Sequence, residues 1–420
     1  MAVDSTNVIE LPWRARLRTS DKGKTLGDEA NALIAMRFAP EIAGLTQYNE
    51  FSRKCEFRRA CPWRQTKAGD EWTDNDDMEL LVWLQHQGIA IRSRSSISEC
   101  VSVCAYGFQV HPVREYLKAL EWDGVPRLNT WLSRYLGARG DEDYLTAVGR
   151  RWPISAVARV MRPGCQADHM LVFEGLQGAG KSRTARLLAV NPDWFVDRLP
   201  DLHTADAADQ LKGKWIVEVA ELAAIRHTAS IESVKGYLTR THDNYRPAYG
   251  RRAIAAPRQC VFIGSTNEEA YLRDRTGNRR YWPVKCGDID IECLEMDRDQ
   301  LWAEARDAYL AHEPWHLDTE QQSLAEAEQE DRVLLSELEQ MVCGYLDTRV
   351  AAGVREVEMR EVLTGALNLD PDKPDYVERC ARLAVQAASA MRSQGWVKIG
   401  VRGRGKTRRN IYRFSQPGIR

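Results

Sequence analysis

Apolar runs of strand length alternate with amphipathic stretches of helix length between residues 165 and 312. The clearest runs cover 170–173, 215–217 and 260–264, and polar or glycine-rich segments follow each of them. Short apolar runs bounded by turn signals are typical of buried strands, and longer stretches with a repeat near 3.6 are typical of surface helices. The alternation therefore predicts an α/β layer.

The chain before this layer has mainly helical patterns. Residues 28–36 have helical spacing, and residues 73–84 form a second such stretch. Thr73 and the acidic residues after it are typical of a capped helix N-terminus. We expect an N-terminal, mainly helical (α+β) region over 1–107 and a helical collar over 108–160. The collar is rich in Trp and Leu, and we expect its tryptophans to pack in the core.

Aromatic and basic residues are mixed between residues 48 and 63. Cations bind phosphate and aromatic rings stack on bases, so contact with nucleic acid is one interpretation of this segment. A small amphipathic sheet with one solvated face produces the same mixture. We favour the sheet, because nothing else in the segment points to a ligand.

An acidic segment and then a basic one follow the α/β layer. Residues 318–339 contain eight Asp or Glu and one Arg, which predicts a solvated linker helix within 316–340. Residues 341–420 then have the order helix, helix, strand, turn and strand, which is the order of a winged helix. From 392 to 420 there are nine Lys or Arg and no acid, which favours DNA contact over a wing that binds protein. The candidate contacts are Arg402, Arg404, Lys406 and Arg408.

Composition narrows the class of protein. A globular chain of 420 residues, 44% hydrophobic and 28% charged, predicts two or three domains. The net charge of −1 means that any DNA-binding surface is local. The ten cysteines include no C-x-x-C pair and have no His at ligand spacing, so we expect thiols and not zinc sites. No run of 18 apolar residues occurs, and we expect a cytoplasmic protein without membrane contact.

Residues 175–182 read Gly-Leu-Gln-Gly-Ala-Gly-Lys-Ser and stand between a predicted buried strand and a predicted helix. This is the phosphate-binding pattern G-x-x-x-x-G-K-S in its strand, loop and helix context. Glycines let backbone N–H groups and the helix N-terminus surround an anion. We expect Lys181 on the β and γ phosphates and Ser182 on Mg²⁺. The expected contacts to ATP are Gly175, Gln177, Gly178, Ala179, Gly180, Lys181, Ser182 and Arg183.

Two acids, Glu218 and Glu221, end the next predicted strand. A triphosphate site needs carboxylates to hold Mg²⁺ and to polarise the attacking water. Residues three apart in an extended strand point to opposite faces, and the sequence does not decide which acid is the metal partner. Glu221 is our first candidate for the base, because it lies at the carboxyl end of the strand. An edge strand with exposed acids is the alternative.

Three further residues are candidates for catalysis. Asn267 follows the predicted strand at 260–264, and an Asn at a strand tip can orient water against the γ phosphate. Arg279 and Arg280 follow a Gly-Asn turn, and an arginine from a neighbouring subunit can stabilise the charge that develops on the γ phosphate. The sequence does not decide between the two arginines, and a surface salt bridge is the alternative.

A basic, aromatic segment separates the acidic strand from Asn267. In a ring of subunits, such an insertion lines the central channel, where Lys and Arg follow the phosphates and Tyr stacks on bases. The candidate DNA contacts in this segment are Lys235, Arg246, Tyr249 and Arg252.

Together these motifs resemble the virulence-associated protein E family of phage and mobile-element proteins, over most of residues 40–315. The resemblance rests on seven segments of this sequence, at 111–117, 122–128, 175–182, 215–222, 235–252, 265–267 and 277–280. It implies an ATPase core over 161–315 that is AAA+-like and similar to the superfamily 3 helicases. It also implies that Lys181 and Ser182 belong to Walker A, Glu218 and Glu221 to Walker B, Asn267 to the sensor position and one of Arg279 and Arg280 to the finger.

The sequence thus predicts a multidomain α/β protein that hydrolyses ATP with Mg²⁺ and acts on DNA. The family resemblance implies a homo-oligomeric ring, with a hexamer as one candidate size, that works in DNA replication with single-stranded DNA in its channel. An NTP-dependent switch or loader that binds DNA or a partner protein without unwinding is the alternative, because phosphate binding does not specify the output.

Overall fold

The computed structural model describes residues 12–197, 207–220, 228–245, 253–272, 277–333, 336–402 and 409–415. The chain divides into two compact units, the first made of 1–269 with 277–329 and the second of 270–276 with 330–420. Within the described ranges, every helix is too short or too polar to cross a lipid bilayer.

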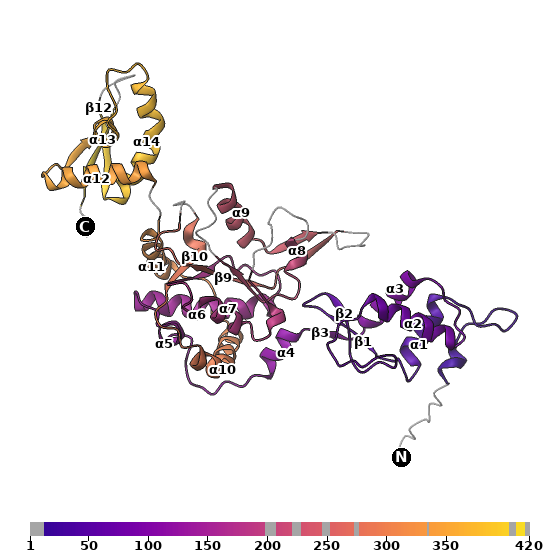
Figure 1. Ribbon diagram of the computed structural model, residues 1–420. Coiled ribbons are helices and arrows are strands. Elements are labelled where there is room, and N and C mark those ends of the chain that lie inside the picture. The colour runs from indigo at the N-terminus through magenta and orange to yellow at the C-terminus, as the bar shows by residue number, and fades with distance from the viewer. Residues whose placement is uncertain are drawn as a thin grey trace, which may run out of the picture. The chain divides into compact units, whose positions relative to one another are not determined.

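The amino-terminal part of the first unit packs three helices against a small sheet (Figure 1). Asp28 caps the first helix by accepting a hydrogen bond from the Asn31 N–H. Thr73 forms a capping box with Asp76, which confirms the cap predicted for this helix. The segment 48–63 contributes most of the hairpin 46–57 to the sheet, which confirms the predicted sheet, but the polar face is largely buried, with Asn49 5% and Glu56 9% exposed. The elements are η1 (Trp13–Arg16), α1 (Glu29–Phe38), β1 (Thr46–Asn49), β2 (Lys54–Phe57), α2 (Asp74–His86), α3 (Arg94–Ala105) and β3 (Gln109–Val110), with the strand order β2-β1-β3.

The next helices pack on the larger core, as predicted for the collar. Trp131 and Trp152 are fully buried there, but the prediction is wrong for Trp122, which is 37% exposed because its indole donates to the Val125 carbonyl in a neighbouring turn. The Trp152 indole donates a hydrogen bond of 3.0 Å to the Phe262 carbonyl, which ties its helix to the central sheet. The elements are α4 (Pro112–Ala119), α5 (Trp131–Leu136) and α6 (Glu142–Met161).

A five-stranded sheet with the order β10-β4-β9-β6-β5 forms the centre of the first unit, and all of its neighbouring strands are parallel. The α/β layer predicted from the sequence is therefore confirmed. Its strands are β4 (Met170–Glu174), β5 (Phe195–Val196), β6 (Ile216–Val219), β9 (Val261–Thr266) and β10 (Tyr281–Lys285). The helices and the hairpin that accompany them are α7 (Lys181–Leu188), α8 (Ala207–Gln210), α9 (Thr228–Leu238), β7 (His242–Tyr245), β8 (Ile254–Pro257), α10 (Ile291–Leu310) and α11 (Thr319–Glu330).

Both faces of this sheet are buried. Alternate residues of β4 and β9 join one core cluster with α6, α7 and α10, which lie on the same side in Figure 1. On the opposite face, Tyr237 of α9 packs edge-on against Phe262 of β9, with ring centroids 6.1 Å apart. Burial on two faces explains why the strands read as continuous apolar runs in the sequence.

The acidic segment behaves differently from the solvated linker predicted over 316–340. Its residues form α11 and, after a break, the start of the next helix. Ala325 and Gln329 of α11 are buried, and the Gln329 amide donates 2.8 Å to the Tyr281 carbonyl on the edge strand β10. The acids lie on the solvent side, while small and amide side chains cover the sheet edge.

The second unit has the element order that the sequence predicted, with one more helix and one more strand. It packs three helices on an antiparallel sheet of order β11-β13-β12, around a core that includes Trp396 and Tyr412. The elements are α12 (Glu337–Ala351), β11 (Glu356–Glu358), α13 (Met359–Leu367), α14 (Tyr376–Ser393), β12 (Trp396–Arg402) and β13 (Arg409–Phe414).

Candidate functional site

The glycine-rich loop joins the carboxyl end of β4 to the first turn of α7. Gly178 and Gly180 have φ angles of 82° and 98°, which L-residues with a side chain rarely adopt. Gly180 is also the N-cap of α7, so the loop turns directly into the helix N-terminus. Gln177 and Arg183 are exposed beside it. The local geometry is therefore the one that the motif predicted.

Lys181 is held over this loop by three hydrogen bonds. Its Nζ donates to the carbonyls of Gly175 and Leu176, at 2.7 and 2.8 Å, and to Asn267 Oδ1 at 2.8 Å. The residue is 7% exposed. Burial lowers the pKa of the Lys181 ammonium, while Cys286 and Glu218 act in the opposite direction. Lys181 and Asn267, predicted separately from the sequence, thus meet at one point.

Glu218 lies beside the first turn of α7. Its Oε1 accepts hydrogen bonds from Ser182 Oγ at 2.6 Å and from Ser265 Oγ at 2.8 Å. The residue is 1% exposed, and its Oε2 has no hydrogen-bond partner among the described residues. An unpartnered oxygen of a buried carboxylate favours the binding of a cation or a hydrogen-bond donor, because leaving a buried acceptor unsatisfied costs free energy. Ser182 and Glu218 therefore have the chemistry that Mg²⁺ requires.

Ser265 is a site residue to which the sequence analysis assigned no role. It continues the buried face of β9, after Val261 and Ile263, at the carboxyl end of the strand. A polar residue in an apolar stripe of period two is the signal that could have identified it. The sequence does not show that its partner is Glu218, because the pairing of β6 with β9 decides this contact.

Arg279 and Arg280 lie at the other edge of the sheet. They precede β10 within η4 (Asn278–Arg280), and Tyr281 pairs with Met170 at the amino end of β4. Lys181 follows the carboxyl end of β4, so the structure does not bring either arginine to Lys181 within one chain. The Arg279 side chain is 59% exposed, whereas Arg280 is partly buried and donates to the Gly277 carbonyl.

The predicted channel segment, 235–252, includes strand β7, which pairs antiparallel with β8 shortly after the segment to form a hairpin. Arg258 anchors its base through two hydrogen bonds to Asp243, of 3.0 and 2.6 Å, and stacks on the Tyr237 ring at 4.3 Å. Lys235 lies in α9 and is only 7% exposed, with its side chain beside Gly277, so its position favours packing over contact with DNA.

Seven predicted site residues lie outside the described residues, and their roles stay predictions. They are Glu221, Arg246, Tyr249, Arg252, Arg404, Lys406 and Arg408. In the second unit, Arg402 is described at the end of β12, with its side chain 72% exposed. Arg402 and Arg409 both pair with Glu358, at 3.4 and 3.0 Å.

The chain is therefore a mixed α/β protein in which a phosphate-loop sequence, a buried carboxylate and a strand-end Asn meet at the carboxyl edge of a parallel sheet. It belongs to the family defined by the virulence-associated protein E-like domain, whose family model matches residues 117–334. This match confirms the family resemblance found in the sequence.

Solved structures give a weaker likeness. The apo structure of the NrS-1 C terminal region (305–718) aligns with a TM-score of 0.45 and 12% identity, over 88% of this chain and 96% of that chain. An A-form apo structure of the same region aligns with a TM-score of 0.44 and 10% identity over the same shares. A search of curated proteins finds no match.

Proposed function

We propose that this protein binds ATP with Mg²⁺ at the carboxyl edge of its parallel sheet and uses ATP hydrolysis to drive work on DNA. The observation that carries the proposal is the 2.6 Å contact between Ser182 and Glu218, next to the contact between Lys181 and Asn267. The phosphate-loop pattern alone names Lys181 and Ser182. The tertiary contacts add an acid and an amide from two other strands at the positions that triphosphate chemistry needs.

The sheet supports an AAA+-like ATPase core. The loop strand β4 lies inside the sheet between β10 and the central strand β9, and β6 and β9 end at the same edge with Glu218 and Asn267. In parallel α/β sheets, ligands bind at the carboxyl ends of the strands. Among the described residues, Lys181, Ser182, Glu218 and Asn267 lie at that edge.

Each residue has a distinct expected role. Lys181 and the loop N–H groups would bind the phosphates, and Ser182 and Glu218 would hold Mg²⁺. We assign the metal role to Glu218, because it touches Ser182, and keep Glu221 as the candidate base. Asn267 would orient the γ phosphate or the attacking water. When bound, the metal ion supplies charge stabilisation to the transferring phosphoryl group.

The position of Arg279 supports oligomeric action. Paired strands place Arg279 and Lys181 beyond opposite ends of β4 and β10, whose five paired residues span roughly 13 Å at about 3.3 Å per residue. An arginine finger at this edge would act on the ATP site of a neighbouring subunit. A ring of identical subunits provides such a neighbour for every site. Its greater exposure favours Arg279 over Arg280.

Contact with DNA is the second part of the proposal. The hairpin β7–β8 is anchored to the core by Arg258, and the basic sequence 246–252 lies between its two strands in the chain. The second unit has three helices and a three-stranded sheet in the order of a winged helix, with Arg402 exposed on β12. The family and these two basic elements support a motor that acts in the replication of a phage or mobile element. Single-stranded and forked DNA are the substrates that probe this activity.

Binding of ATP with Mg²⁺ and release of phosphate test the first part. We expect binding and turnover in the unaltered protein, loss of both in Lys181→Ala, and no change in Lys118→Ala, which removes an exposed lysine of α4. Equal activity of Lys181→Ala and the unaltered protein contradicts the proposal.

Strand separation distinguishes a motor from a switch or loader. A motor separates a labelled forked duplex only with ATP and forms a larger assembly in mass measurements with ATP and Mg²⁺. An ATPase rate that DNA leaves unchanged, without strand separation, favours the NTP-dependent switch. A protein that turns over ATP as a strict monomer contradicts the subunit-spanning site.

A further inference from the structure

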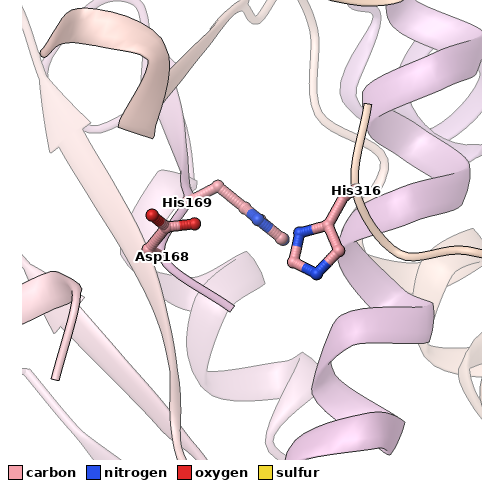
Figure 2. A group of neighbouring side chains, drawn as sticks. All are labelled: Asp168, His169 and His316. Carbon is pink, nitrogen blue, oxygen red and sulfur yellow. The ribbon is translucent and has the colours of Figure 1, made fainter. Parts of the chain in front are cut away.

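A second group of ligand-type side chains lies at the amino edge of the central sheet, away from the phosphate loop. Asp168, His169 and His316 each offer one ligand atom, and the three atoms lie within 4.8 Å of one another. Figure 2 shows the imidazole of His169 directed toward that of His316, with the carboxylate of Asp168 beside the base of the His169 side chain.

The fold brings together residues that are far apart in the chain. Asp168 and His169 immediately precede β4. Helix α10 begins after β10 and ends at Leu310, and His316 follows in the connection to α11. The neighbouring Trp315 indole donates 2.8 Å to the Gln166 carbonyl, which holds this connection against the segment before β4.

His169 supplies the strongest indication of a ligand. It is 4% exposed, and its ring stacks on Trp282 with centroids 3.8 Å apart, so its orientation is set by packing. Its Nε2 is buried and has no hydrogen-bond partner among the described residues. Buried polar atoms are rarely left unsatisfied, so a nitrogen in this position indicates an absent partner.

Asp168 is engaged only weakly by its neighbours. Arg279 lies 3.8 Å from its Oδ2 and Gln166 3.4 Å from the same oxygen, whereas Oδ1 takes part in neither contact. The Arg279 side chain is largely exposed, and such ion pairs contribute little to stability. Asp168 can therefore act as a ligand without losing a strong interaction.

The space and the protonation states suit a metal ion. The three side chains border a cavity of about 180 Å³, which also admits water. Burial lowers the pKa of both His169 and His316, so both rings are neutral near neutral pH, which is the form that ligates metals. Around a tetrahedral ion with bonds of about 2.0 Å, neighbouring ligand atoms lie about 3.3 Å apart. A small movement of the exposed His316 side chain can bring the three ligand atoms to this separation.

We propose that Asp168, His169 and His316 form a binding site for one divalent cation of the zinc class, with water as the fourth ligand. Two imidazoles and one carboxylate suit Zn²⁺ or Co²⁺, whereas Mg²⁺ and Ca²⁺ prefer oxygen ligands. The bound ion would join the amino end of β4 to the connection after α10, beside Arg279. It is distinct from the Mg²⁺ position at Ser182 and Glu218, which lies at the other edge of the sheet.

Titration of the nucleotide-free protein with Co²⁺ tests the site. We expect one Co²⁺ per chain and the visible d–d absorption of a low-coordinate ion, without the near-ultraviolet charge transfer of a thiolate ligand. His316→Ala should weaken binding more than about tenfold, since loss of a supporting residue alone costs 10–100-fold at metal sites. Asp168→Asn should weaken it in the same direction.

Two control variants make the outcome decisive. His86→Ala removes an exposed histidine at the end of α2 and should bind Co²⁺ as the unaltered protein does. Lys181→Ala should also bind Co²⁺ normally, which separates this site from the proposed ATPase. Binding that His316→Ala and Asp168→Asn leave unchanged, a thiolate charge-transfer band or the absence of stoichiometric Co²⁺ binding overturns the assignment.

Discussion

Ser182 Oγ lies 2.6 Å from Glu218 Oε1, which joins the first turn of α7 to the end of β6. The contact links the last residue of the phosphate-loop motif to a carboxylate 36 residues further along the chain. Ser265 holds the same oxygen from the neighbouring strand. The position of Glu218 is thus determined by two hydroxyl groups, and its second oxygen is buried without a hydrogen-bond partner among the described residues.

Substitution of Glu218 should act through the metal ion. We expect Glu218→Gln to raise the Mg²⁺ concentration for half-maximal ATP turnover at least about tenfold, because it removes the charge but keeps the shape of the side chain. Ser265→Ala should have a smaller effect in the same direction, since it leaves the carboxylate in place. Turnover measured against Mg²⁺ concentration checks both variants, and an unchanged Mg²⁺ requirement in Glu218→Gln contradicts the assigned role.

A subunit-spanning site predicts complementation between two inactive variants. We expect Arg279→Ala to lower ATP turnover by about 10³-fold or more, as removal of an arginine finger does. Mixing it with Lys181→Ala should restore measurable turnover, because some interfaces then combine an intact loop with an intact arginine. Phosphate release from the mixture is the measurement. If the mixture stays inactive while the two variants assemble together, Arg279 is not a finger that acts between subunits.

The basic strands of the second unit are partly neutralised by Glu358, which pairs with Arg402 and Arg409. We expect Glu358→Gln to tighten duplex DNA binding, because it frees the two arginines to contact phosphates. The slope of the logarithm of the binding constant against the logarithm of the salt concentration should become steeper by about one for each additional phosphate neutralised. Glutamine keeps an acceptor at the start of α13. Glu337→Gln, an exposed acid on α12, is the matched control. Equal salt dependence in both variants contradicts DNA contact by these arginines.

Asp76 should make the amino-terminal part sensitive to acid. Burial acts to raise the pKa of Asp76, but hydrogen bonds from Arg64, Thr73 and Trp63 outweigh it and lower the pKa to about 2. Because the folded pKa lies below the unfolded value, this carboxylate stabilises the fold above about pH 4 and loses that contribution as the pH falls toward 2.

Hydrogen exchange of the amides in α2 measures this contribution. We expect Asp76→Asn to lower the local opening free energy by about 2 kcal/mol at pH 7, and by much less at pH 2.5. Asp74→Asn, which removes a neighbouring acid whose side chain is 89% exposed, should change it little. A difference between Asp76→Asn and the unaltered protein that does not shrink at low pH contradicts the explanation.

Local features were readable from the sequence. The helices with capping residues, the buried strands and the turn at Gly178 and Gly180 depend on neighbouring residues alone. Two helices and the final hairpin of the second unit were likewise visible as a succession of periodic segments. The acidic segment was predicted less well, because its buried residues, Ala325 and Gln329, do not form a recognisable apolar pattern. Only the contact of Gln329 with β10 shows that this helix packs on the sheet.

By itself, the sequence contained the pattern of a phosphate-binding loop and named Lys181, Glu218 and Asn267 as candidates, because each lies in or after a recognisable strand. Tertiary structure alone decided that Glu218 touches Ser182, that Ser265 supports it and that His169 meets His316. These contacts join residues far apart in the chain. Their distances depend on strand order, strand direction and the length of α10, which local patterns do not encode.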